Sequence, residues 1–303
     1  MQRGRTRPEC GADVLKSKII NGWGLFWLIS LPISSAIILK MTSVDLATAR
    51  GVSSMIEIAV RCAVPLLYVT FAASSVNVLF PGAFGRWMLR NRKFLGLAFA
   101  AAMAWQFTFI LWMVTRHADH YVNRIYALSD VIEGIGGYTL LIAMTITSFK
   151  FGRSRLTPKQ WRVLHTVGIY WLWTYAFVTY WWYLFYSNQP LAINYVYYWM
   201  GFLAWGMRMA AWTRKRWQKA DVEASRAMTW LPGAAVAIVG LLGVTFGSPW
   251  GKAIYDFGFS VPALNTIGVY TPYFPFVPYY PLVLMMLGAG LTLKIRQQSA
   301  AAG

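Results

Sequence analysis

The feature that most restricts the fold is a series of apolar segments, each about 20 residues long, which is the length of helix needed to cross the hydrocarbon core of a membrane. Of the 303 residues, 57% are hydrophobic and 13% are charged. This composition excludes an ordinary soluble domain. We therefore expect an all-α integral membrane protein that crosses the membrane eight times, at residues 19–39, 55–80, 94–115, 131–149, 163–186, 191–212, 228–247 and 276–293.

The basic residues lie almost entirely between these segments. The connections that would share one side of the membrane carry 22 Lys and Arg, whereas those on the other side carry five. Because basic residues are enriched in cytoplasmic loops, both termini are expected in the cytoplasm, in a plasma membrane of the bacterial inner-membrane type. The net charge of +18 then reflects topology and contact with anionic membrane lipids, and no nucleic-acid partner is expected. Residues 1–18 lack the pattern of a cleavable signal, so the first span is expected to be retained.

One histidine stands out inside an apolar segment. Residues 161–186 include 12 aromatic residues, and after Arg162 the only acidic or basic side chain is His165. An ionisable residue inside a membrane helix is costly and therefore suggests a functional site. A neutral imidazole can ligate haem iron. The alternative is a structural histidine near the cytoplasmic interface that is bonded to a polar neighbour.

Glu57 and Arg61 are four residues apart, so they lie on one face of the second predicted helix and can form an ion pair. They could bind a substrate, a proton or a haem propionate, or they could simply neutralise each other. His117, Asp119 and His120 are weak candidates for a transition-metal site. Because no further ligand lies at a suitable spacing outside this short segment, no metal site is predicted.

Three further patterns concern helix ends, helix packing and aromatic surfaces. Asp130 and Glu133 have the spacing of an N-cap and the third residue of a helix. Gly243 and Gly247 form a GxxxG pattern that is typical of close helix packing. The aromatic connection 248–275 is expected to lie at the membrane interface. Aromatic residues of the fifth and sixth spans could line a site for a quinone, carotenoid or tetrapyrrole, or could only pack against lipid: Tyr195, Tyr197, Tyr198, Trp199 and Trp205.

Three segments resemble ferric reductase-like transmembrane domains, a superfamily that includes the haem-binding membrane subunit of the periplasmic methionine sulfoxide reductase system. They are RNRKFLGLAFAAAMAWQF, IGGYTLLIAMTITSF and RLTPKQWRVLHTVGIYW. The resemblance covers roughly residues 52–187, and its best motif is Trp161–Leu164–His165. It implies a six-helix core at 19–212 that follows the basic tail 1–18. The region 213–303 then adds a cytoplasmic loop and two further membrane helices.

The resemblance also implies b-type haem between the third and fifth helices and electron transfer across the membrane. His165 matches one family ligand, whereas the other two ligand positions fall on Gln106 and Val178. The resemblance therefore implies an electron-transfer protein that could carry haem b, with His165 and Gln106 at the cofactor. Such a protein would be an oxidoreductase component without its own flavin or nicotinamide domain.

Two alternatives stay open beside this one. The first is a haem-free accessory or scaffold subunit of a larger membrane complex, and the second is a small-molecule channel or carrier that uses Glu57 and Arg61. A partner membrane or redox protein is expected for a protein of this kind, and a quinone or other hydrophobic small molecule is a possible ligand.

Overall fold

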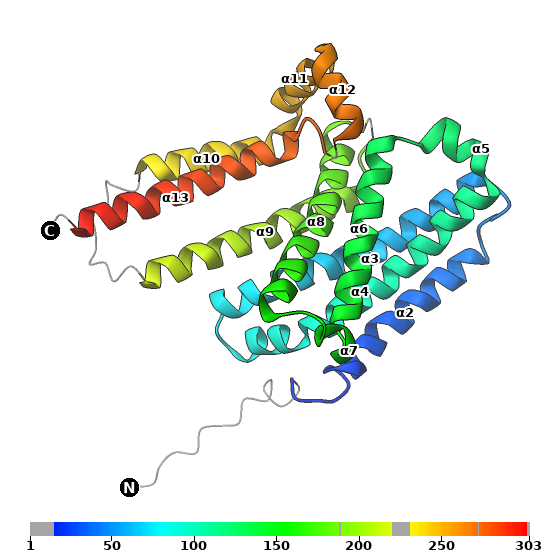
Figure 1. The fold of residues 1–303 in the computed structure, drawn as a ribbon, viewed down its shortest axis with the longest axis horizontal. Helices are drawn as coiled ribbons and strands as arrows, with labels where there is room; N and C mark the ends of the chain where they lie inside the picture. Colours follow the sequence, from blue (N-terminus) through cyan, green and yellow to red (C-terminus); the bar gives the residue numbers. More distant parts are fainter. Residues whose placement is uncertain (1–14, 188, 220–230, 272, 302–303) are drawn as a thin grey trace, which may run out of the picture. The chain divides into compact units, whose positions relative to one another are not determined.

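The protein was analysed as a computed structural model, which describes residues 15–187, 189–219, 231–271 and 273–301. Across these residues the chain is helical and contains no strand (Figure 1). It divides into two compact units. The first unit comprises the described residues up to Tyr126 together with Leu140–Trp173, and the second comprises Ala127–Thr139 together with the described residues from Thr174 onwards.

The first unit is built mainly from three long helices. These are α2 (Trp23–Met41), α3 (Ala49–Leu79) and α4 (Ala83–Arg116). A short helix α5 (Ala118–His120) and a π-helical turn η1 (Tyr121–Ile125) follow α4. The unit also holds α7 (Lys150–Arg153), the end of α6 (Leu128–Thr147) and the start of α8 (Pro158–Phe185).

The core of the first unit is formed where α2, α3 and α4 pack together. Six residues from these helices are at most 1% exposed and contact one another: Ile37, Val52, Met55, Ala59, Phe109 and Met113. The indole nitrogen of Trp105 on α4 also donates to the Ser34 hydroxyl on α2 at 3.0 Å. In a membrane, where apolar side chains gain little by leaving lipid, such close packing and interhelical hydrogen bonds hold helices together.

Among its described residues, the second unit contains the start of α6, the end of α8 and five further helices. The first four are α9 (Ala192–Lys219), α10 (Leu231–Thr245), α11 (Gly247–Ser260) and α12 (Pro262–Tyr270). A 3-10 turn η3 (Val277–Tyr279) leads into the last helix, α13 (Tyr280–Ala301). Helices α10 and α13 lie side by side along most of their length (Figure 1, yellow and red).

Every predicted span contains a helix, so the all-helical fold is confirmed. Four of these helices are long and apolar enough to cross a membrane by length and composition: α2, α3, α4 and α6. The apolar helix α10 and the segment Pro249–Ser260 form a further pair, bent by 80°. Helices α8 and α9 have 28 residues each, but their many Trp and Tyr side chains lower their hydropathy. A multi-pass membrane protein is therefore supported, while the count of eight crossings stays a prediction.

Two local predictions were wrong. Helix α6 begins at Leu128, so Asp130 lies inside its first turn and does not cap it. Helix α10 ends at Thr245, so Gly243 and Gly247 do not share a helix and form no GxxxG face. Most of the described residues of the aromatic connection 248–275 form α11 and α12, and its place at the membrane interface stays a prediction.

Candidate functional site

The start of α8 determines where His165 lies. Pro158 is the first helical residue, where its missing N–H costs nothing. The Thr157 hydroxyl accepts from the Gln160 N–H at 3.2 Å, and the Gln160 side chain accepts from the Thr157 N–H at 2.9 Å. This reciprocal capping box satisfies amide groups at the helix start. The signal is present in the sequence as Thr-Pro-Lys-Gln, and it places His165 in the second turn of the helix.

His165 makes a hydrogen bond to the end of α6. Its Nε2 atom lies 3.0 Å from the Thr147 hydroxyl oxygen. That hydroxyl has one hydrogen, which it donates to the Ala143 carbonyl oxygen at 2.7 Å. With the hydroxyl hydrogen on the Ala143 carbonyl, the contact is satisfied by the tautomer of His165 that carries its proton on Nε2 and leaves Nδ1 unprotonated. The Nε2 atom of His165 is thus occupied by its hydrogen bond to the Thr147 hydroxyl.

Trp161 completes the same cluster in the first unit. Its indole nitrogen donates to the Thr147 carbonyl oxygen at 3.1 Å, and its ring centroid lies 4.2 Å from that of His165. The guanidinium carbon of Arg153 lies 4.8 Å from the indole centroid, within cation–π distance. The Trp-x-x-Leu-His motif therefore joins the start of α8 to the end of α6 through two hydrogen bonds, while its two rings contact each other on α8.

The residues at the three positions that the resemblance implies fit a haem poorly. Because the Nε2 atom of His165 is bonded to Thr147, this histidine could offer iron only its Nδ1 atom, the ring nitrogen nearer the backbone. Gln106 is 6% exposed on α4, and its neutral amide is a poor axial ligand. Val178, in the second unit, has no ligating atom. The three positions that the resemblance implies thus hold one hydrogen-bonded imidazole, one amide and one alkyl group.

The remaining polar candidates of the first unit are separate features. Arg61 Nη2 lies 2.5 Å from Glu57 Oε1, and their side chains are 30% and 48% exposed respectively. His117 ends α4, and Asp119 and His120 lie in α5. Within the residues that the structure describes, no three or more His, Cys, Asp or Glu side chains form a group that could hold a metal ion.

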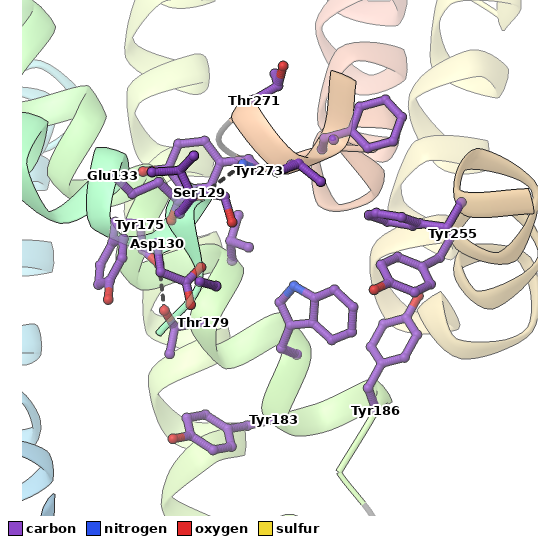
Figure 2. Close-up of a pocket in the computed structure, with 18 of the residues that line it drawn as sticks. Ser129, Asp130, Glu133, Tyr175, Thr179, Tyr183, Tyr186, Tyr255, Thr271 and Tyr273 are labelled. Atoms are coloured by element: carbon purple, nitrogen blue, oxygen red, sulfur yellow. Dashed lines mark hydrogen bonds between the residues drawn. The ribbon is translucent and has the colours of Figure 1, made fainter. Parts of the chain in front are cut away.

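A pocket of about 810 Å³ lies wholly within the second unit (Figure 2). It is lined by the start of α6, the end of α8, and residues from α11, α12 and the segment that follows α12. Its two acidic residues are Asp130 and Glu133, one helical turn apart on α6. Glu133 is 8% exposed, and its Oε1 accepts the Tyr273 N–H at 2.8 Å.

Sequence reasoning missed this pocket because it assigned Asp130 and Glu133 to a helix cap. The aromatic site was expected in the fifth and sixth predicted spans, and the residues named for it were those at 195–205. Of those, Tyr198 is fully buried and stacks on Phe177 at 5.3 Å, whereas Tyr195 and Trp199 are exposed. The aromatic residues that line the pocket come from the end of the fifth predicted span, at the end of α8, and from residues 255–274. The unusual feature in the sequence was a glutamate inside an apolar segment, at Glu133.

Comparisons with known proteins give one informative similarity. The chain is 31% identical over 102 residues to the protein-methionine-sulfoxide reductase heme-binding subunit MsrQ of Herminiimonas arsenicoxydans. The match covers 32% of this chain and 44% of that protein, so it extends over less than half of the relative. No family model matches the chain, and no solved structure matches it. The similarity supports a distant relationship to the haem-binding, ferric reductase-like membrane subunits.

Proposed function

We propose that this protein is a multi-pass membrane subunit of a redox-type complex that keeps a ferric reductase-like helical core as a scaffold and holds no haem on His165. The observation that carries the proposal is the hydrogen bond between His165 Nε2 and the Thr147 hydroxyl. That bond gives the histidine a structural role, in which it joins α8 to α6. The loss of ligating groups at Gln106 and Val178 points the same way.

The distant relative is named as a subunit of a reductase, and this supports a partner protein for the present chain. In the proposed arrangement eight helices cross the membrane, six in the core at 19–212 and two in the region 213–303, with both termini in the cytoplasm. The protein itself contributes membrane anchoring and a docking surface, and catalysis belongs to the partner. Lipid contacts follow from the many exposed apolar side chains on its helices.

A second candidate is a haem-binding electron-transfer subunit, which the similarity to a heme-binding relative favours. The two candidates differ in whether the protein binds haem. The full-length protein is expressed with ample haem, purified in detergent and examined by absorption spectroscopy. We expect haem far below one per chain in monodisperse protein. Stoichiometric haem, with a spectrum that changes when His165→Ala is introduced, would contradict the scaffold proposal and establish the second candidate.

A gain-of-ligand variant tests whether the core retains the shape of a haem site. Gln106→His combined with Val178→His restores the ligand pattern that the resemblance implies. We expect haem uptake by this variant and none by the matched control, Gln106→Asn combined with Val178→Ala. If the double histidine variant folds but stays free of haem, the core has lost the shape as well as the ligands.

A further inference from the structure

The pocket of the second unit has an unusual charge for this protein. The chain carries 28 Lys and Arg against 10 Asp and Glu, yet two of those ten acids line this one pocket. Of the lining residues that the structure describes, none is Lys, Arg or His. A pocket whose charged groups are all carboxylates favours a cation. A ligand of this pocket is therefore expected to carry a positive charge.

Glu133 is held in place for such a contact. It is 8% exposed, and the Tyr273 N–H fixes one of its carboxylate oxygens at 2.8 Å. An ionised carboxylate can accept several hydrogen bonds through its two oxygens, so this bond orients the group without exhausting it. Asp130, one turn earlier, is exposed. The two acids thus form a pair in which one is buried and fixed and the other is open to solvent.

Aromatic rings form the opposite side of the pocket from the acids (Figure 2). The ring centroids of Trp182 and Tyr186 are 4.2 Å apart, and those of Trp182 and Tyr255 are 5.1 Å apart. Tyr186 and Tyr255 are also in ring contact, at 5.9 Å. These three rings make a joined aromatic surface. Aromatic faces attract organic cations, quaternary ammonium groups among them, so the side of these rings that faces the pocket offers a surface for such a group.

We propose that this pocket binds an organic ammonium group, with the charge directed toward Glu133 and Asp130 and the carbon substituents against Trp182, Tyr186 and Tyr255. A simple metal ion would use the carboxylates but not the rings, and a neutral apolar ligand would use the rings but not the negative charge of the carboxylates. The ammonium group could belong to a free amine or to the headgroup of a phospholipid. The inference does not depend on haem, because it uses none of the three positions discussed for haem, His165, Gln106 and Val178, although Val178 also lines the pocket.

The test uses choline and its uncharged carbon analogue, in which carbon replaces the quaternary nitrogen. Binding is measured by calorimetry on the full-length protein in nanodiscs of phosphatidylglycerol. We expect saturable binding of choline and at least about tenfold weaker binding of the neutral analogue. Repeating the titration with phosphatidylethanolamine in the nanodisc separates the two sources. Competition identifies a lipid headgroup, and unchanged choline binding identifies a free amine.

Two variants assign the binding to the pocket. Glu133→Gln removes the charge but keeps an oxygen to accept the Tyr273 N–H, and Asp130→Asn changes an exposed residue with little risk to folding. Each is expected to weaken choline binding by about tenfold and to leave the neutral analogue unaffected. Asp119→Asn, which changes an acid in the first unit, is the matched control and should bind choline normally. Absence of choline binding by the unmodified protein, equal binding of both compounds, or normal choline binding by both pocket variants would overturn the proposal.

Discussion

Asn91 illustrates how much of this structure depends on single buried polar side chains. It is 1% exposed on α4 and accepts the Gly22 N–H at 2.9 Å. Its amide nitrogen donates to the Asn21 side chain at 2.9 Å and to the Trp87 carbonyl oxygen at 3.1 Å. Asn91 thus supplies the acceptor for the Gly22 N–H just before α2 and joins that segment to α4, as the Thr147–His165 bond joins α6 to α8. Buried polar groups are costly without such partners.

The Glu57–Arg61 ion pair predicts that a single variant is less stable than the double variant. Glu57→Gln leaves the Arg61 charge without this partner, whereas Glu57→Gln combined with Arg61→Gln removes both charges. We expect the single variant to give a lower yield of monodisperse protein, as measured by size-exclusion chromatography. Because both side chains are partly exposed, the difference in stability should be about 1 kcal/mol or less. A double variant that is worse than the single one would favour separate roles for the two residues, as in a carrier.

Helices α10 and α13 approach each other closely at glycine residues. A Cβ added at Gly288 would lie 2.6 Å from the Ala237 backbone nitrogen and 2.9 Å from its Cβ. A Cβ at Gly240 would lie 2.6 Å from Met285 Cγ. The pairing therefore depends on glycines in both helices, although the GxxxG pattern seen in the sequence is not the one used. Close approach of backbones at small residues is a common basis of helix association in membranes.

This packing makes Gly288 and Gly290 a matched pair on one helix. Gly288→Ala places its methyl group against the backbone of α10, which cannot move aside as a side chain can. We expect a loss of about 1–3 kcal/mol in the free energy of unfolding. Gly290→Ala meets nothing within 4 Å and should be neutral or slightly stabilising. Thermal unfolding in detergent compares the two variants, and equal stability would show that α10 and α13 do not pack as described.

For the whole molecule, the distribution of Lys and Arg predicts the orientation in the membrane. Single cysteines at Arg86 and Arg155, in a chain with Cys10 and Cys62 replaced, should react with a membrane-impermeant thiol reagent only from the cytoplasmic side. A cysteine at Lys40 should react only from the opposite side. All three side chains are exposed, so burial cannot explain a lack of reaction. Labelling of position 86 or 155 from outside would disprove the eight-crossing topology.

The sequence by itself determined the class of this protein and the approximate position of its long helices. Segment length, hydropathy and charge are properties of consecutive residues, and the bilayer accepts few structures other than helices, so these features could be read directly. The Thr157–Gln160 capping box and the Glu57–Arg61 pair are also local, because both connect residues within one helical turn. The ion pair was predicted and is present as such.

Only the tertiary structure decided what the polar side chains contact. Thr147 lies 18 residues before His165, and Tyr273 lies 140 residues after Glu133. No sequence pattern states such pairings, because they arise when helices that are distant in the chain come together. The pocket likewise takes its acids from α6 and its rings from α8 and α11. The residues within each segment determine which helices form. The packing of those helices against one another determines which side chains share a site.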